Sequence, residues 1–317
     1  MSEHDPPHPT SGVSTFLEAG APRPARPDVA ARKNAETREG EGGGVSSTGG
    51  YMRRKIIWTV LGSLSVLAFS LKLPAQAPPA CAALPDHGRL RSALQSVIKE
   101  GQNGNGGLGN QEWAAVVNRD GIVCAVVFSG TNRGQEWPGS RMIAAEKANT
   151  ANALSGPNFA LSTANLYYPS LPGQSLYGLI NTAPPNPQAA FGDPTSFGTT
   201  DDPMVGKPAG GLVVFGGGLA LYSEKGEIVG AVGASGDTSC ADHVIAWKVR
   251  HELGLDAVPM GVSPDHNDNM IQDIQHGVSQ SGWGHPNCKA GTPSEPIIKT
   301  LSQKFPTGPR HLRAAAR

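Results

Sequence analysis

The spacing of hydrophobic positions predicts a helix followed by a β-hairpin in the first part of the patterned region. Residues 86–100 carry apolar side chains at helical intervals behind an acidic residue, which predicts a helix. Residues 112–130 hold two runs of β-forming residues around Asp120-Gly121, a strong hairpin signal. Cys124 alternates with apolar residues in the second run, so we expect it on one face of a strand.

The next helix is predicted over residues 139–154, with Ser140 placed to cap it. Its buried face is expected to carry small side chains at Ala144, Ala148 and Ala151. Such a face allows close approach of the sheet or of a ligand, and we favour the sheet. Lys147 falls on the same face, which is unusual because lysine is rarely buried without a partner.

A long segment and a second hairpin follow. Residues 155–208 show no long period and many prolines, glycines and aromatics, which predicts a loop-rich insertion with one short helix. Residues 210–236 predict a hairpin that turns at Lys225-Gly226. Glycines 216–218 interrupt its first strand and indicate a bulge or the close approach of a ligand or backbone.

The last predicted helix spans residues 240–253. One stripe of it is expected to face the core or a pocket, and contains Cys240, Val244, Trp247 and His251. His243 lies nearer Arg250 on a more polar edge, about 80° from His251 on a helical wheel. From spacing alone, His251 is interpreted as a core histidine and His243 as a surface residue.

The predicted order is helix, hairpin, helix, insertion, hairpin, helix. Because hairpins pair strands antiparallel, we expect an α+β fold with a single antiparallel sheet of four or five strands flanked by helices. Residues 83–289 are assigned to this one domain, with the insertion at 155–208. The polar, proline-bearing residues 290–317 are assigned to a flexible tail.

The net charge bears on possible binding partners, and the residues before the domain bear on the compartment. With 26 basic and 26 acidic residues, the chain offers no electrostatic case for binding nucleic acid. Residues 52–82 resemble an export signal, with a basic start, an apolar run at 56–71 and a small, proline-rich end. We expect a periplasmic or secreted protein that begins between Pro78 and Leu84 after cleavage.

The alternative is a membrane-anchored protein, held by residues 56–71 if they stay uncleaved. That run is shorter than the about 20 residues of a spanning helix, which favours export. Residues 1–51 contain too few apolar positions to fold. Either translation begins at Met52 and this upstream stretch is mis-assigned, which we favour, or the stretch is a disordered cytoplasmic tail.

The cysteine count agrees with export. An even number of cysteines in an exported chain indicates disulfides, and the four cysteines allow three pairings. We favour Cys81 with Cys124 and Cys240 with Cys288, because these pairs join neighbouring segments. No Cys-x-x-Cys pair is present, so a zinc site of that type is not expected.

Three segments in this order resemble the GlcG/HbpS-type haem-binding proteins, whose domain also occurs at the C-terminus of PduO-type corrinoid adenosyltransferases. The segments are AAEKANTANA (144–153), GKPAGGLVVFGGG (206–218) and GEIVGAVGASGDTSCADHVIA (226–246). The resemblance covers residues 86–255 and implies an α+β fold of the profilin and roadblock type. The longer insertion and the cysteines mark an extended variety of the family.

The resemblance implies an exported haem- or tetrapyrrole-binding protein for haem sequestration, storage or sensing, and it also implies a homo-oligomer. Two alternatives stay open: an exported enzyme of unknown reaction, and a partner-binding module without a cofactor. Ser235 lies in GASGD, which departs from the spacing of a nucleophile elbow. We assign no catalytic residue, and an enzyme is the less favoured interpretation.

Under this resemblance, haem is expected between the helices at 140–154 and 240–253, beside Gly217 and Gly218. His251 is the first choice as iron ligand and His243 the second, because imidazole is a common haem ligand. Three further contacts are expected, the propionate partners Lys147 and Arg250 and the hydroxyl of Thr150.

A separate loop also carries side chains of the kinds that bind metals. They are Asp265, His266, Asp268 and Asp273. Runs of this composition more often form turns, and we favour a turn here.

Overall fold

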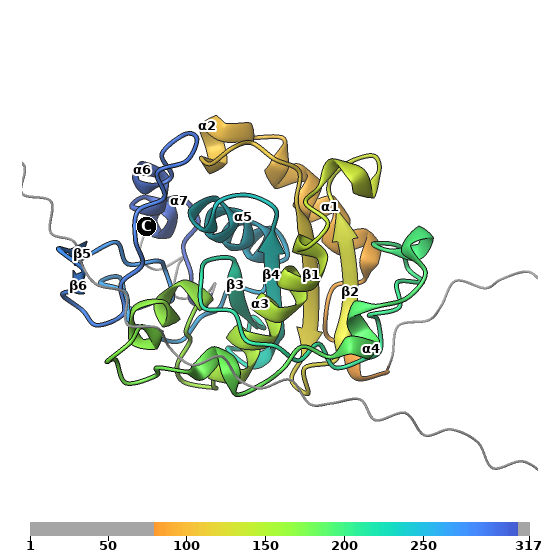
Figure 1. Ribbon diagram of the computed structural model, residues 1–317, viewed down its shortest axis with the longest axis horizontal. Coiled ribbons are helices and arrows are strands. Elements are labelled where there is room, and N and C mark those ends of the chain that lie inside the picture. Colours follow the sequence, from red (N-terminus) through yellow and green to blue (C-terminus); the bar gives the residue numbers. More distant parts are fainter. Residues whose placement is uncertain (1–78, 310–317) are drawn as a thin grey trace, which may run out of the picture. The chain divides into compact units, whose positions relative to one another are not determined.

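The computed structural model describes residues 79–309, shown in Figure 1. The expectations for residues 1–51 and for the export signal therefore lie outside the described residues, apart from the last few positions before residue 83. Within the described range, no helix combines the length and the apolar character needed to cross a membrane.

The centre of the fold is one antiparallel sheet of four strands. The strands are β1 (Trp113–Asn118), β2 (Val123–Phe128), β3 (Gly218–Tyr222) and β4 (Ile228–Ser235). Their order across the sheet is β2-β1-β4-β3, and each neighbouring pair is antiparallel. The two hairpins and the α+β class predicted from the sequence are confirmed.

Helices cover both faces of this sheet (Figure 1). On one face lie α1 (His87–Ile98) and α5 (Ser239–Glu252), and on the other lies α3 (Ser140–Leu154). Alternating strand residues separate the two cores: Val116 and Val232 pack with α1 and α5, whereas Val117 and Ala231 pack with α3. This alternation is the period-two pattern of a sheet buried on both sides.

Helix α3 packs directly on the backbone of β4. Ala144, Ala148 and Ala151 are fully buried. A Cβ built on Gly233 would collide with the carbonyl group of Ala144, so helix and strand meet where neither has a side chain of any size. The small-residue face of α3 thus receives the sheet, as the favoured interpretation predicted.

Three details differ from the sequence predictions. Ser140 is the first residue of α3 rather than its cap, and Gly139 before it provides no side-chain cap. Strand β3 begins at Gly218, so the apolar run before the three glycines is not part of the strand. The loop after α1 contains a short helix, α2 (Gly101–Asn105).

The segment expected to be a flexible tail is ordered up to residue 309. It forms α6 (Glu295–Ile298) and α7 (Leu301–Lys304). Ile298 and Leu301 are buried in the same core as α1 and α5. Two apolar side chains among many polar ones gave too weak a period to predict this docking.

The insertion is built from short helical turns. They are η3 (Thr163–Leu166), η4 (Tyr168–Ser170), η5 (Leu179–Asn181), α4 (Pro187–Ala190) and η6 (Pro194–Ser196). The other small elements are η1 (Pro79–Cys81), η2 (Arg133–Gln135), β5 (Ile274–Gln275) and β6 (Val278–Ser279). Buried residues such as Leu166 and Met204 attach the insertion to the domain.

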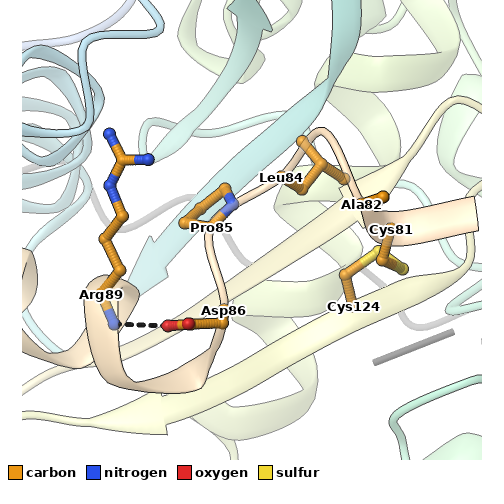
Figure 2. A pocket seen from close by; sticks show the side chains of 7 residues that line it. All are labelled: Cys81, Ala82, Leu84, Pro85, Asp86, Arg89 and Cys124. Atoms are coloured by element: carbon orange, nitrogen blue, oxygen red, sulfur yellow. Dashed lines mark hydrogen bonds between the residues drawn. A yellow bond between two sulfur atoms is a disulfide. The ribbon is translucent and has the colours of Figure 1, made fainter. Parts of the chain in front are cut away.

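Both predicted disulfides are present. Cys81 joins Cys124 and Cys240 joins Cys288, with Cα–Cα distances of 5.6 and 6.0 Å. Figure 2 shows the first of them in the wall of a cavity of about 260 Å³, beside the start of α1, where Asp86 caps the helix by accepting a hydrogen bond from the Arg89 amide. The Cys81–Cys124 disulfide ties the chain before α1 to strand β2.

Candidate functional site

The structure exchanges the environments predicted for the two histidines of α5. His243 is fully buried, and its Nε2 accepts a hydrogen bond from the Met270 amide at 3.1 Å. Residues 267–271, which follow α5 in the chain, cover this side of the helix; a helical wheel contains no information about them. Burial lowers the pKa of His243 to about 4, so the ring is neutral at pH 7. The expected surface position is therefore wrong.

His251 lies at the boundary of the fold instead of in its core. Its side chain is 32% exposed, because α5 ends one residue later. Its Nδ1 is 2.7 Å from Asp256 Oδ2, and its ring packs edge-on against Phe305. No hydrogen-bond partner for Nε2 is found among residues 79–309. An imidazole held by a carboxylate at one nitrogen and open at the other is a typical metal ligand.

Arg250 points inward and is already paired. Its guanidinium makes two hydrogen bonds to Asp268, at 2.6 and 2.8 Å, and both side chains are fully buried. It also donates to the Ala220 carbonyl at 3.2 Å and stacks over Trp247. This environment leaves no access for a propionate, so the predicted role of Arg250 does not fit its position.

The candidate metal cluster in the loop after α5 is not assembled. Asp268 is taken up by Arg250, and Asp265 and His266 are exposed. Asp273 instead accepts hydrogen bonds from the Ser279 hydroxyl and the Ser281 amide, which lower its pKa despite the opposing effect of burial. The turn interpretation favoured from the sequence agrees with this arrangement.

Lys147 and Thr150 of α3 are also engaged within the protein. Lys147 Nζ donates to Asp242 Oδ2 at 2.5 Å and to the Ala234 carbonyl at 3.0 Å. The Thr150 hydroxyl donates to the Glu146 carbonyl at 2.7 Å and accepts from the Val213 amide at 2.9 Å. Asp242 is therefore the partner expected for a lysine on the buried face of α3.

The predicted position for haem, between α3 and α5, is wrong because these helices lie on opposite faces of the sheet. Gly217 and Gly218, at the start of β3, lie where side chains of α3 and α5 contact each other. A Cβ built on Gly217 would lie 2.9 Å from Lys147 Nζ, and one on Gly218 would collide with the backbone of α3. These glycines allow close approach of protein to protein.

A buried acidic group completes this region and was not predicted. Glu112 precedes β1, is fully buried, and neither of its carboxylate oxygens has a hydrogen-bond donor among the described residues. Burial, and next the negative charge of Asp242, raise its pKa well above the usual value. The raised pKa favours the neutral form of Glu112 beside Asp242. No periodic signal marks a glutamate that follows a glycine loop.

The N-terminus of α5 gathers a second set of reactive side chains. Ser239 Oγ accepts a hydrogen bond from the Gly216 amide and is 2.7 Å from His285 Nε2. His285 Nδ1 is 2.7 Å from the Pro286 carbonyl, so Nδ1 carries the proton and Nε2 accepts from Ser239. The Cys240–Cys288 disulfide lies beside this ring. No pattern in the sequence marks His285 as part of a site.

A cavity of about 440 Å³ opens at the start of β1. It is lined by Trp113, Asn132, Arg133, Gly134, Pro138, Pro194 and Phe197. Two aromatic rings and two prolines make it largely apolar, and Arg133 provides a positive charge. Trp113 Nε1 is buried and has no acceptor among the described residues.

The fold places this chain among the α+β proteins. Its antiparallel sheet is covered by helices on both faces, and charged side chains are buried at its centre. Residues 93–250 match the family described as "Haem degrading protein HbpS-like". The chain belongs to this HbpS-like family through that region, which contains the whole sheet and most of α5. No curated protein matches the sequence.

The solved structures that match this chain have low sequence identity to it. ORFY of Klebsiella pneumoniae is 21% identical, covering 58% of this chain and 94% of its own, with a TM-score of 0.37. The PduOC:heme complex is 21% identical, covering 54% and 96%, with a TM-score of 0.38. A double mutant of HbpS from Streptomyces reticuli is 20% identical, covering 57% and 99%, with a TM-score of 0.34.

Proposed function

We propose that this chain is a haem- or tetrapyrrole-binding protein that acts outside the cytoplasm in haem sequestration, storage or sensing. The observation that carries the proposal is the match of residues 93–250 to a family described by its action on haem. The proposal of export rests on the signal-like segment at 52–82 and agrees with two disulfides, which persist in oxidising compartments.

His251 is the proposed iron ligand. Of the two histidines considered, it alone reaches the surface, and its Nδ1 hydrogen bond to Asp256 would orient Nε2 toward an incoming iron. Arg89, an exposed residue of α1, donates to the Leu253 carbonyl at 2.7 Å, two residues beyond His251. It provides a positive charge for a haem propionate near that ligand. Bound haem would supply the iron and the redox chemistry.

Haemin titration of the purified protein tests this function. A Soret band that saturates at one haemin per chain supports it, and His251→Ala should shift that band and weaken affinity. His276→Asn is the matched control, because His276 is exposed and its positive φ suits asparagine. Absence of saturable binding overturns the function. Unchanged binding by His251→Ala would move the site elsewhere, with the apolar cavity beside Trp113 as the next candidate.

Export and assembly are tested separately. Sequencing the N-terminus of protein from the native source should find a start between Pro78 and Leu84. A chain that retains residues 56–71 and remains in the membrane fraction would support the anchored alternative. The proposed homo-oligomer should give a sedimentation mass that is a multiple of the single chain.

A further inference from the structure

A group of three metal-binding side chains lies at the N-terminus of α5. The ligand atoms of Cys240, His285 and Cys288 all lie within 4.8 Å of one another, and no other group of three or more such side chains in the described part of the chain meets this spacing. Two of the three come from a His-Pro-Asn-Cys segment and the third from the helix. In the present state the two sulfurs are bonded to each other.

The surroundings favour a negatively charged sulfur at this point. The Cys240 amide at the start of α5 is directed at Cys288 Sγ, with an N–S distance of 3.1 Å. Gln272 Nε2 lies 3.8 Å from Cys240 Sγ. Amide donors and a helix N-terminus stabilise a thiolate over a thiol. Cys288 is partly exposed, so a reductant can reach the bond from its side.

The third ligand is held in place by its neighbours. The His285 ring is buried between Ser239 and the Pro286 carbonyl, and Tyr167 packs on it with a centroid distance of 5.2 Å. Its amide also donates to the Ile271 carbonyl at 2.7 Å. A ligand that is oriented before the metal arrives gives a more specific site than a mobile one.

We propose that Cys240, His285 and Cys288 form a binding site for one zinc-like divalent cation, which exists only when the Cys240–Cys288 disulfide is reduced. Two molecules of a small thiol exchange with the disulfide: the protein S–S bond breaks, two protein thiols form, and the small thiols leave as their own disulfide. The cation then displaces the two thiol protons to solvent and binds two thiolates and His285 Nε2, whose lone pair it takes over from the Ser239 hydroxyl while Nδ1 keeps its hydrogen bond to the Pro286 carbonyl. Two thiolates and an imidazole suit zinc, and one position is left open.

Cobalt is a suitable probe, because thiolate-bound tetrahedral Co²⁺ is coloured. Cys81→Ser/Cys124→Ser in the full chain leaves one disulfide and is the reference protein. After reduction with a phosphine, which does not carry a competing thiol, Co²⁺ should bind one per chain with a thiolate-to-metal charge-transfer band. Zn²⁺ should remove that band and protect two thiols from a thiol reagent. The oxidised reference protein should bind neither ion.

The ligand variants make the assignment specific. His285→Ala in the reference protein should weaken binding at least about tenfold, and Cys288→Ser should remove the charge-transfer band. His276→Asn should change neither. Equal affinity in His285→Ala, or absence of the band in the reduced reference protein, overturns the site. Near-ultraviolet circular dichroism monitors folding. If reduction removes this signal and Zn²⁺ does not restore it, the proposed site is also overturned.

Discussion

Lys147 and Asp242 form an ion pair, with 2.5 Å between Nζ and Oδ2, that joins two helices on opposite faces of the sheet. Both side chains are buried, and Lys147 also donates to the carbonyl of Ala234 near the end of β4. A buried pair of this kind fixes how α3 and α5 are placed relative to the sheet end. It makes Lys147 part of the protein interior.

Breaking this pair from one side should be costly. Asp242→Asn removes the carboxylate that pairs directly with the buried Lys147 ammonium, and we expect a loss of about 3–5 kcal/mol in the free energy of unfolding. Lys225→Met, in the exposed turn between β3 and β4, is the control and should stay within about 0.5 kcal/mol. Urea unfolding at pH 7 measures both. A loss below 1 kcal/mol for Asp242→Asn would show that Lys147 has another partner.

Glu112→Gln should stabilise the protein at neutral pH. The folded-state pKa of Glu112 is raised, mainly by burial, so its contribution to stability is present at low pH and is lost as pH rises above the unfolded value of 4.5. A glutamine cannot ionise, and its side-chain amide is a donor that suits the neighbouring Asp242 carboxylate. The unfolding free energies of variant and parent should therefore agree near pH 4 and diverge toward pH 8 in favour of the variant. A difference independent of pH would contradict the raised pKa of Glu112.

Periodic patterns in the sequence predict the regular helices and strands of this fold. They do not predict environments that depend on segments distant in the chain. The hairpins, α1, α3 and the disulfide pairs follow from periodicity, turn residues and cysteine count. The environment of His243 depends on Asn269 and Met270, which no helical wheel of α5 contains. Glu112 is marked by no pattern.

The buried histidines His243 and His285 should make the free energy of unfolding fall in mild acid. Burial lowers the pKa of His243 to about 4, with Arg250 and His285 adding to the effect and Asp268 and Asn269 opposing it. Between the unfolded value of 6.5 and about 4, the unfolded chain binds a proton that the native ring does not. The contribution of each such histidine to the free energy of unfolding is therefore fully present above pH 6.5. It decreases as pH falls, by about 1.4 kcal/mol per pH unit for each group.

Urea unfolding at pH 7, 6 and 5 measures this slope. Burial lowers the pKa of His285 to about 4 as well, so both rings contribute to the slope. His243→Asn should reduce it by about 1.4 kcal/mol per pH unit below pH 6, and the exposed-residue control His276→Asn should not. An unchanged slope in His243→Asn would mean that the ring is protonated in the native protein.

The contact between α3 and β4 predicts the effect of a single methyl group. A Cβ at Gly233 meets the Ala144 carbonyl and the Ala148 amide, both of them helix backbone. Gly233→Ala must therefore push α3 away from the sheet, and overpacking of this kind costs about 1–3 kcal/mol. Gly139→Ala is the matched control, because nothing lies within 4 Å of a Cβ there and its φ of −66° suits alanine. Thermal unfolding should separate the two variants.

Haemin binding by the same pair of variants decides what the small-residue face of α3 is for. If the face serves only to receive β4, Gly233→Ala lowers stability while haemin affinity at pH 7 stays within about threefold of the parent, because His251 lies at the far end of α5. If haem instead enters beside Ala144 and Ala148, the displaced helix changes affinity and the Soret position together. Such a joint change would reject His251 as the ligand and return the haem site to the surface of α3.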